Sequence, residues 1–260
     1  MALYAVAADK GSPGVTTTAV ALGAVWPGRA LVAECDPAGG DLAYRLPGRG
    51  GAPLDPNHGL LSLAATARHG LEPARVWEHV QVLGGGLEVL VGTSTAEQAG
   101  GLAGLWDPLG QALARLPEAD VLADLGRIGP RAPTLPLLRH AAVAVLVARA
   151  TVDSVAHARD RLAALAGDLG DGGVAGPALG LVLVTEPKES RAAAAQVGEA
   201  LRAARLPAEV LGTIAHDPKA ARLLSGRWHG RLGGSLLVRT ARQVAAQLHA
   251  RVAAEREPAR

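Results

Sequence analysis

The sequence predicts an α/β fold in which a mostly parallel, twisted sheet of about seven strands is flanked by helices. Short apolar runs recur along the chain and alternate with stretches of helical periodicity, as parallel strands joined by crossover helices require. Several runs are continuous Val/Leu segments, which is expected for strands that are buried on both faces. The expected strands lie at residues 3–8, 30–34, 87–92, 121–125, 143–148, 179–184 and 210–214.

Helical periodicity fills most of the intervals between these strands. The expected helices lie at residues 15–26, 58–69, 73–80, 97–115, 152–168, 189–204, 218–225 and 235–253. Residues 45–59 are rich in Gly and Pro and predict a long surface loop, and residues 166–180 predict a connector before the sixth strand. Because neither loop bounds a separate pattern and no internal repeat is visible, we expect residues 1–260 to form one domain.

Composition narrows the class of protein. Hydrophobic residues make up 49% of the 260 residues while aromatic residues make up 2%, so Leu, Val and Ala must build the core. A single Cys excludes an intramolecular disulfide framework, and the eight histidines lack the spacing of metal-ligating pairs. The N-terminal segment does not have the pattern of a signal peptide, and no apolar run is long enough to span a membrane. We therefore expect a protein of the reducing cytoplasm.

The formal net charge of +2 is small, but it is unevenly distributed. From residue 200 onward the chain carries eleven Lys and Arg residues and four Asp and Glu residues. Such a basic quarter can simply form solvated helix faces, or it can bind non-specific DNA or another acidic partner. The closing helix at 235–253 has an Ala-rich apolar stripe without bulky anchors, so we expect it to pack on the sheet rather than on a membrane.

The segment KGSPGVTTT, residues 10–18, has the layout of a phosphate-binding loop. It lies between the first expected strand and the first expected helix, and Gly11 and Gly14 permit close approach of a ligand to the backbone. A conventional loop of this kind reads G-x-x-x-x-G-K-[ST], with a lysine before the hydroxyl residue. Here Val15 precedes Thr16, and the lysine of the segment is Lys10 at its front.

Two aspartates follow neighbouring strands of the predicted sheet. Asp36 belongs to an Asp-Pro-x-Gly segment after the second strand, and Asp124 lies near the end of the fourth. Because the carboxyl ends of parallel strands meet at one edge of a sheet, both side chains should lie beside the glycine-rich loop. Acidic groups there can bind Mg²⁺ or orient a water molecule.

Together these segments resemble the MinD/ParA family of P-loop ATPases, whose deviant Walker A loop reads K-G-G-x-G-K-[ST]-T. Lys10, Gly11, Gly14, Thr16 and Thr17 match that loop. The family's D-x-D-P-x-G-N segment is matched by residues 34–40, its Walker B strand by residues 121–124, and its late l-G-x-I-P-x-D segment by residues 211–217. The resemblance spans nearly the whole chain and implies a P-loop NTPase fold.

The resemblance also implies roles for individual residues. Lys10 would reach across a nucleotide-sandwiched homodimer to the phosphates of the partner, Thr16 would ligate Mg²⁺, and Asp36 would position the attacking water. The remaining loop positions, Ser12, Pro13, Val15 and Thr17 among them, would surround the ATP phosphates. Two residues after the last strands, Glu186 and Asp217, could line the adenine pocket.

The departure from the family pattern is Val15, which stands where the family has its second lysine. A charge-assisted contact to phosphate contributes roughly 1.5–3 kcal/mol, so its loss weakens ATP binding by about one to two decades. Hydrolysis depends on the same charge in the transition state. Pro13 also removes one backbone N–H donor from the loop. Another basic residue, such as Lys188 or Arg127, could replace the missing charge.

Two functions remain open from the sequence. The first is a nucleotide-dependent switch that dimerises and, on stimulation by a protein partner, positions machinery such as a septum, a chromosome region or a pilus apparatus. The alternative is a non-catalytic scaffold or localisation adaptor that keeps the fold and the dimer surface without ATP turnover. Val15 favours the scaffold, whereas Lys10, Thr16, Asp36 and Asp124 favour the switch. Non-specific DNA binding through the basic C-terminal quarter is a third hypothesis.

Overall fold

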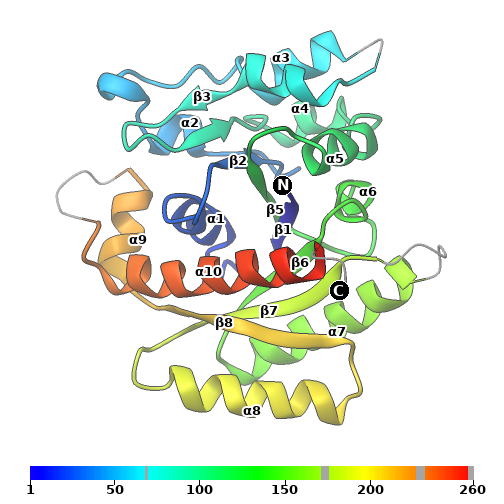
Figure 1. The fold of residues 1–260 in the computed structure, drawn as a ribbon, viewed down its shortest axis with the longest axis vertical. Coiled ribbons are helices and arrows are strands. Elements are labelled where there is room, and N and C mark those ends of the chain that lie inside the picture. Colours follow the sequence, from blue (N-terminus) through cyan, green and yellow to red (C-terminus); the bar gives the residue numbers. More distant parts are fainter. Residues whose placement is uncertain (68–69, 171–175, 227–231, 257–260) are drawn as a thin grey trace.

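The computed structural model describes residues 1–67, 70–170, 176–226 and 232–256, and its architecture confirms the α/β class (Figure 1). Its centre is a sheet of eight strands in the order β3-β4-β2-β5-β1-β6-β7-β8. The neighbouring strands are parallel except β3 and β4, which are antiparallel. The strands are β1 (Leu3–Ala8), β2 (Ala30–Glu34), β3 (Gln81–Val82), β4 (Glu88–Leu90), β5 (Asp120–Arg127), β6 (Val143–Arg149), β7 (Ala178–Thr185) and β8 (Ala208–Ala215).

Helices cover both faces of this sheet (Figure 1). One face carries α1 (Val15–Gly23), α2 (Leu42–Arg45), α9 (Pro218–Leu224) and α10 (Leu236–Arg256). The other face carries α3 (Leu60–Thr66), α5 (Trp106–Ala114), α6 (Leu135–Leu138), α7 (Val152–Gly170) and α8 (Ser190–Ala203). The short helix α4 (Ala96–Gly100) and two 3₁₀ segments, η1 (Arg49–Gly51) and η2 (Pro73–His79), complete the described structure.

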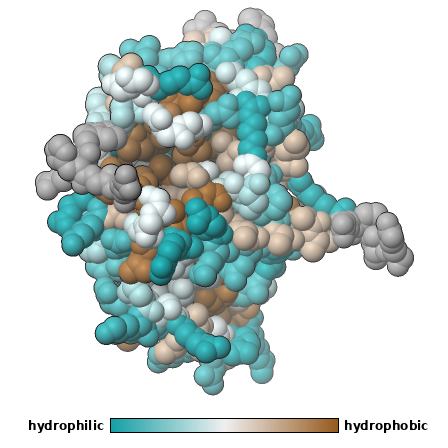
Figure 2. Space-filling view, turned by 60° about the vertical axis from the view of Figure 1, so that its left-hand side comes forward, coloured by the Kyte–Doolittle hydropathy of each residue, from teal (hydrophilic) through white to brown (hydrophobic). Residues whose placement is uncertain are grey.

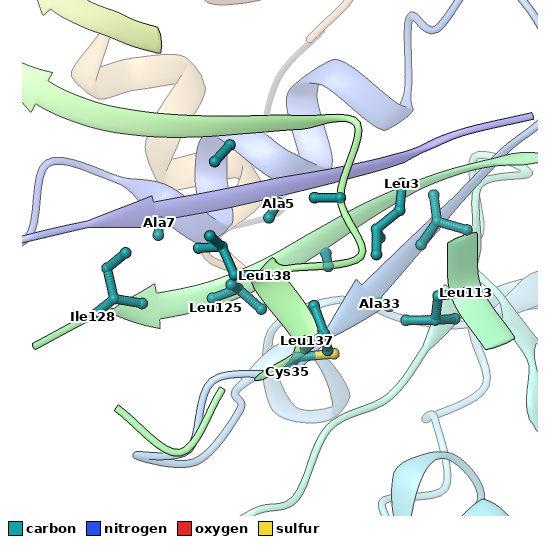
Figure 3. Packing of buried hydrophobic residues seen from close by; sticks show 14 of the residues in the cluster. Leu3, Ala5, Ala7, Ala33, Cys35, Leu113, Leu125, Ile128, Leu137 and Leu138 are labelled. Atoms are coloured by element: carbon teal, nitrogen blue, oxygen red, sulfur yellow. The ribbon is translucent and has the colours of Figure 1, made fainter. Parts of the chain in front are cut away.

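The core is built from Leu, Val and Ala, as the composition predicts. Every residue of β1 is buried, and successive side chains enter opposite faces of the sheet. Leu3 and Ala5 belong to one buried cluster with Leu125 of β5 and with Leu137 and Leu138 of α6, on the α5–α8 side of the sheet (Figure 3). This burial on both faces fixes β1 at the centre of the sheet, and the loop at residues 9–14 follows directly from it.

All seven expected strands are present, and the differences concern short elements. The structure adds β3, which has two residues and is too short to produce a periodic signal. The helix expected at 97–115 is two helices, α4 and α5, because Gly100, Gly101 and Gly104 lower helix propensity between them. The loop expected at 45–59 contains η1 and follows the short helix α2. The helix expected at 73–80 is the 3₁₀ segment η2.

Among the described residues, no helix is both long enough and apolar enough to cross a membrane. The apolar stripe of α10, which includes Leu237, Val244 and Leu248, is buried on the sheet instead. The prediction that this helix packs within the fold is therefore confirmed.

Candidate functional site

The glycine-rich loop joins β1 to α1 and has the backbone conformation that its glycines allow. Gly11 and Gly14 have φ values of 76° and 98°, a region that side chains with a Cβ disfavour. Gly14 is the N-cap of α1, and its carbonyl accepts a hydrogen bond from the Thr18 N–H at 2.8 Å. The first turn of α1 contains no acidic residue, so its free N–H groups and helix dipole favour an anion at this end.

The side chain of Val15 turns away from that anion site and into the protein. It is 7% exposed and packs in a small apolar cluster with Val6, Ala8 and Val147. An isopropyl group can neither donate a hydrogen bond nor carry charge. Residue 15 therefore anchors the first turn of α1 to β1 and β6 and leaves the phosphate cradle to backbone groups.

Asp124 lies in the middle of β5 and is fully buried. Its Oδ1 accepts a hydrogen bond from the Gly126 N–H at 2.9 Å, whereas Oδ2 has no hydrogen-bond partner among the described residues. The Thr16 side chain faces the same carboxyl group. Burial raises the pKa of Asp124 to about 7, and the Thr16 hydroxyl and the Gly126 N–H partly oppose that increase.

This pair fits a magnesium ion better than it fits a purely structural role. A buried carboxylate oxygen without a partner costs stability, and a cation would both satisfy it and favour its ionised form. Hydroxyl and carboxylate oxygens are ligands of the kind Mg²⁺ prefers. The described residues contain no group of three His, Cys, Asp or Glu that could hold a metal alone. The ion would therefore need oxygens from phosphate and water, which is its usual coordination in nucleotide sites.

Asp36 lies at the same edge, close to the end of β5. A Cβ on Gly126 would lie 2.0 Å from Asp36 Oδ2, so this carboxylate packs directly on the glycine two residues beyond Asp124. Asp36 Oδ1 accepts a hydrogen bond from the Ala38 N–H at 2.8 Å. Burial raises the pKa of Asp36, and the positive charge of Arg127 opposes this. The structure thus brings together Asp36 and Asp124, as the strand ends predict.

Glu34 is a buried carboxylate next to Asp124, and the sequence does not reveal its role. Its carboxylate is 2% exposed and accepts hydrogen bonds from three backbone N–H groups. The donors are Asp41 at 2.8 Å, Leu42 at 3.0 Å and Gly92 at 3.0 Å. Glu34 therefore ties the loop after β2, which carries Asp36, to the end of β4. The sequence does show an acidic residue at the end of a buried strand. It does not show the hydrogen bond from the Gly92 N–H, because Gly92 is 58 residues away.

Lys10 is exposed at the front of the loop, where a second molecule could reach it. Its neighbour Asp9 accepts a 2.6 Å hydrogen bond from Arg161 Nε, and both side chains are largely buried. This ion pair fixes the start of the loop to α7. The role of Lys10 in a dimer stays a prediction.

A pocket of about 400 Å³ lies beside the loop. One wall is formed by loop and α1 residues, including Ser12, Gly14 and Thr17, and the opposite wall includes Asp217 at the β8–α9 turn. Asp217 caps α9 through the Ala220 N–H at 3.1 Å. Glu186 does not line this pocket. Its carboxylate pairs with Nδ1 of His216, and His216 does line the pocket.

A larger pocket of about 550 Å³ lies elsewhere and contains none of the predicted site residues. It is lined by apolar side chains of α1, α9 and the β3–β4 hairpin, including Val20, Leu87 and Leu223. Figure 2 shows apolar surface gathered in a hollow on this side of the molecule. Several predicted loop residues and Asp217 line the smaller pocket instead, whereas Thr16, Asp36 and Asp124 line neither pocket.

Comparison with known proteins gives the fold a family context. No family model and no curated protein matches the sequence. Solved structures do match: a ParA family ATPase from Chlorobium tepidum has a TM-score of 0.69 and 15% identity, with 94% of this chain and 98% of that chain covered. The cell division ATPase MinD from Pyrococcus furiosus has a TM-score of 0.68 and 17% identity, with 96% and 98% covered.

A third match is an enzyme of different function, cobyrinic acid a,c-diamide synthase from Mycobacterium smegmatis, whose structure holds an ATP analogue and magnesium. Its TM-score is 0.65 at 20% identity, with 99% of this chain and 97% of that chain covered. At these identities the likeness concerns the fold, which hosts more than one function. The chain has the MinD/ParA-like P-loop ATPase fold that its sequence predicts.

Proposed function

We propose that the chain is a MinD/ParA-like nucleotide-dependent switch that dimerises and positions cellular machinery, with ATP hydrolysis weakened by Val15. The observation that carries this proposal is the buried Asp124 carboxylate beside the Thr16 hydroxyl, with Oδ2 making no hydrogen bond to any residue that the structure describes. A fold without a ligand gains nothing from such a group. Magnesium bound there would neutralise phosphate charge.

Each residue of the site then has a defined task. The N–H groups of the loop and of the first turn of α1 bind the phosphates, and Thr16 and Asp124 hold the metal. Asp36 orients water at the edge where its carboxylate packs on Gly126. Lys10, exposed at the front of the loop, contacts the partner subunit's nucleotide. The positioned machinery would be a septum, a chromosome region or a pilus apparatus, reached through a protein partner.

The second candidate is a scaffold or localisation adaptor without ATP turnover. The packing of Val15 against Val6, Ala8 and Val147 favours it, because residue 15 serves stability and supplies no charge. This candidate keeps the fold and the dimer surface. It differs from the switch in one measurable respect: dimerisation is independent of nucleotide.

The test is a titration of ATP·Mg²⁺ into the wild type, Val15→Lys and Val15→Leu, with light scattering at each point. Val15→Leu is the matched control because it enlarges the side chain without adding charge. Micromolar binding that produces a dimer in the wild type supports the switch. Absence of binding in the wild type and in Val15→Leu, with binding in Val15→Lys, supports the scaffold.

A further inference from the structure

A cation at the end of β6 lies next to the place of the missing lysine. Val15 packs on Val147 of β6, and Arg149 is the last residue of the same strand. Side chains of a strand alternate between faces, so Val147 and Arg149 point to the same side of the sheet. Arg149 therefore lies one step, about 6–7 Å, beyond the residue that contacts Val15.

Arg149 lies on the side of Val147 that is nearer the loop at residues 9–14. β6 is the neighbour of β1, with Leu146 in register with Ala7, so both strands end at the same edge. Arg149 is exposed and lines the pocket of about 400 Å³ together with Ser12, Pro13 and Gly14. Its backbone N–H donates to Ser154 Oγ at 3.0 Å, which fixes the strand end at the start of α7.

The other nearby cations are placed less well for the same task. The positive charge of Arg127 acts on Asp36, and the exposed Lys188 is not among the residues that line the pocket. Arg222 does line it, but from α9, on the wall formed by Ala221 and Ser225. Within the described part of the chain, no ion pair involves the Arg149 side chain.

We propose that Arg149 contacts the β- and γ-phosphates of a bound nucleotide and supplies the positive charge that Val15 cannot. This inference rests on the proposed nucleotide site and names the ligand class as a nucleoside di- or triphosphate. A guanidinium binds phosphate oxygens through paired donors, so it can serve from a strand end as a lysine serves from the first turn of a helix. In this chain the positive charge would come from Arg149 at the end of β6 rather than from position 15 at the start of α1.

The test compares ATP·Mg²⁺, ADP·Mg²⁺ and AMP binding by calorimetry in the wild type, Arg149→Gln, Arg149→Lys and Arg222→Gln. Arg139→Gln, at an exposed arginine after α6, is the matched control. We expect Arg149→Gln to weaken ATP binding by about tenfold to a hundredfold, with AMP binding unchanged. Arg149→Lys should retain most of the affinity. Adding Val15→Lys to Arg149→Gln should restore ATP binding, because either position can deliver the charge.

Each contrary result has a separate meaning. Wild-type binding that Arg149→Gln leaves unchanged overturns the inference and leaves the nucleotide switch standing. Equal losses for ATP and AMP also overturn it, because Arg149 would then not act on the outer phosphates. A loss confined to Arg222→Gln assigns the role to α9 instead. If the wild type binds no nucleotide while Val15→Lys does, both the switch and this inference fail, and the scaffold remains. Equal melting temperatures exclude misfolding as the cause of any loss.

Discussion

Two buried carboxylates stand side by side at the same edge of the sheet, and they are used differently. Glu34 of β2 and Asp124 of β5 are paired in register, with exposures of 2% and 0%. Burial raises the pKa of each. Glu34 accepts three backbone hydrogen bonds, whereas Asp124 accepts one from the Gly126 N–H, and its Oδ2 has no hydrogen-bond partner in the described part of the chain.

The difference separates structure from function. A buried carboxylate whose two oxygens both accept backbone hydrogen bonds holds loops in place. A buried carboxylate with an unused oxygen destabilises the fold unless something binds it. Glu34 is therefore the structural member of the pair and Asp124 the functional one. Exchanging one oxygen for nitrogen in each should have opposite consequences.

The largest effect is expected for Asp124→Asn. Removing the charge should lower Mg²⁺-dependent ATP affinity on the order of a hundredfold, because the amide is a poor ligand for a hard cation. Unfolding in urea without nucleotide should show unchanged or increased stability, since an unpaired buried charge is gone. The binding control is titration in EDTA, where wild type and variant should be equal. A variant that loses stability and keeps Mg²⁺-dependent binding would contradict the assignment.

Glu34→Gln should act in the reverse sense. The Gln amide can accept through only one of its two terminal atoms, so at least one backbone N–H among Asp41, Leu42 and Gly92 loses its acceptor. We expect a loss of about 1–3 kcal/mol in the free energy of unfolding, measured in urea. ATP affinity should change by less than about threefold, because the backbone groups that donate to the Glu34 carboxylate all lie outside the loop at residues 9–14. A large loss of affinity at full stability would assign Glu34 to the binding site.

The contrast between these carboxylates also marks how far the sequence could predict the site. Asp36 and Asp124 were predictable because each follows a buried Val/Leu run, and the ends of parallel strands converge. The hydrogen bonds of Glu34 could not be predicted, because one donor, the Gly92 N–H, is far away in the chain. The close approach of Asp36 to Gly126 is likewise a tertiary contact between two strand ends.

The strands that the sequence predicts are likewise those whose signal is local, and the strand that it misses depends on tertiary contacts. Long apolar strands buried on both faces produce a local signal, so seven strands were predicted at nearly their observed positions. β3 has two residues, Gln81 and Val82, and depends on pairing with β4 rather than on its own pattern. The position of Arg149 at the same pocket as Ser12, Pro13 and Gly14 follows from strand order, because β6 lies next to β1 although far from it in sequence.

The pH dependence of binding sharpens the same comparison. Asp124 must be ionised to hold a cation, and its pKa is raised to about 7 chiefly by burial. Mg²⁺-dependent ATP affinity should therefore fall about tenfold for each pH unit below 7 and level off above it. In the absence of ligand, the free energy of unfolding depends on pH in the opposite direction from ATP affinity. The folded state holds the proton more tightly than the unfolded one, so stability decreases as the pH rises from about 4 toward 7.

Titration at pH values from 5 to 8 tests this in the wild type and in Asp124→Asn. Glu34 and Asp36 also have pKa values raised by burial and contribute to the wild-type profile. They remain in the variant, so the difference between the two profiles reports Asp124. Parallel profiles would show that the ionisation of Asp124 does not control binding in this range and would contradict its role as a ligand with a raised pKa.

If the basic C-terminal quarter binds DNA without sequence preference, we expect the affinity to be at most moderate at low salt. Its cations are partly engaged already, since Arg251 of α10 pairs with Glu209 and Glu255. Affinity for duplex DNA should therefore be weak and should fall steeply between 50 and 200 mM salt, as for any contact made mainly to phosphate. Fluorescence anisotropy at several salt concentrations measures this. Binding that is independent of salt would exclude this kind of contact.

The smallest expected effect concerns Val15 itself, the neighbour of Thr16 that faces the other way. Val15→Ala removes two methyl groups from the contact with Val6, Ala8 and Val147, and should cost about 2 kcal/mol of unfolding free energy. ATP affinity should stay the same, because the lost groups face the sheet and not the pocket. Thr16→Val should do the opposite, retaining stability while losing the hydroxyl that faces Asp124. If Val15→Ala instead changed nucleotide affinity, residue 15 would still belong to the phosphate site, and the division between an anchoring residue and a ligand-binding residue at the start of α1 would be wrong.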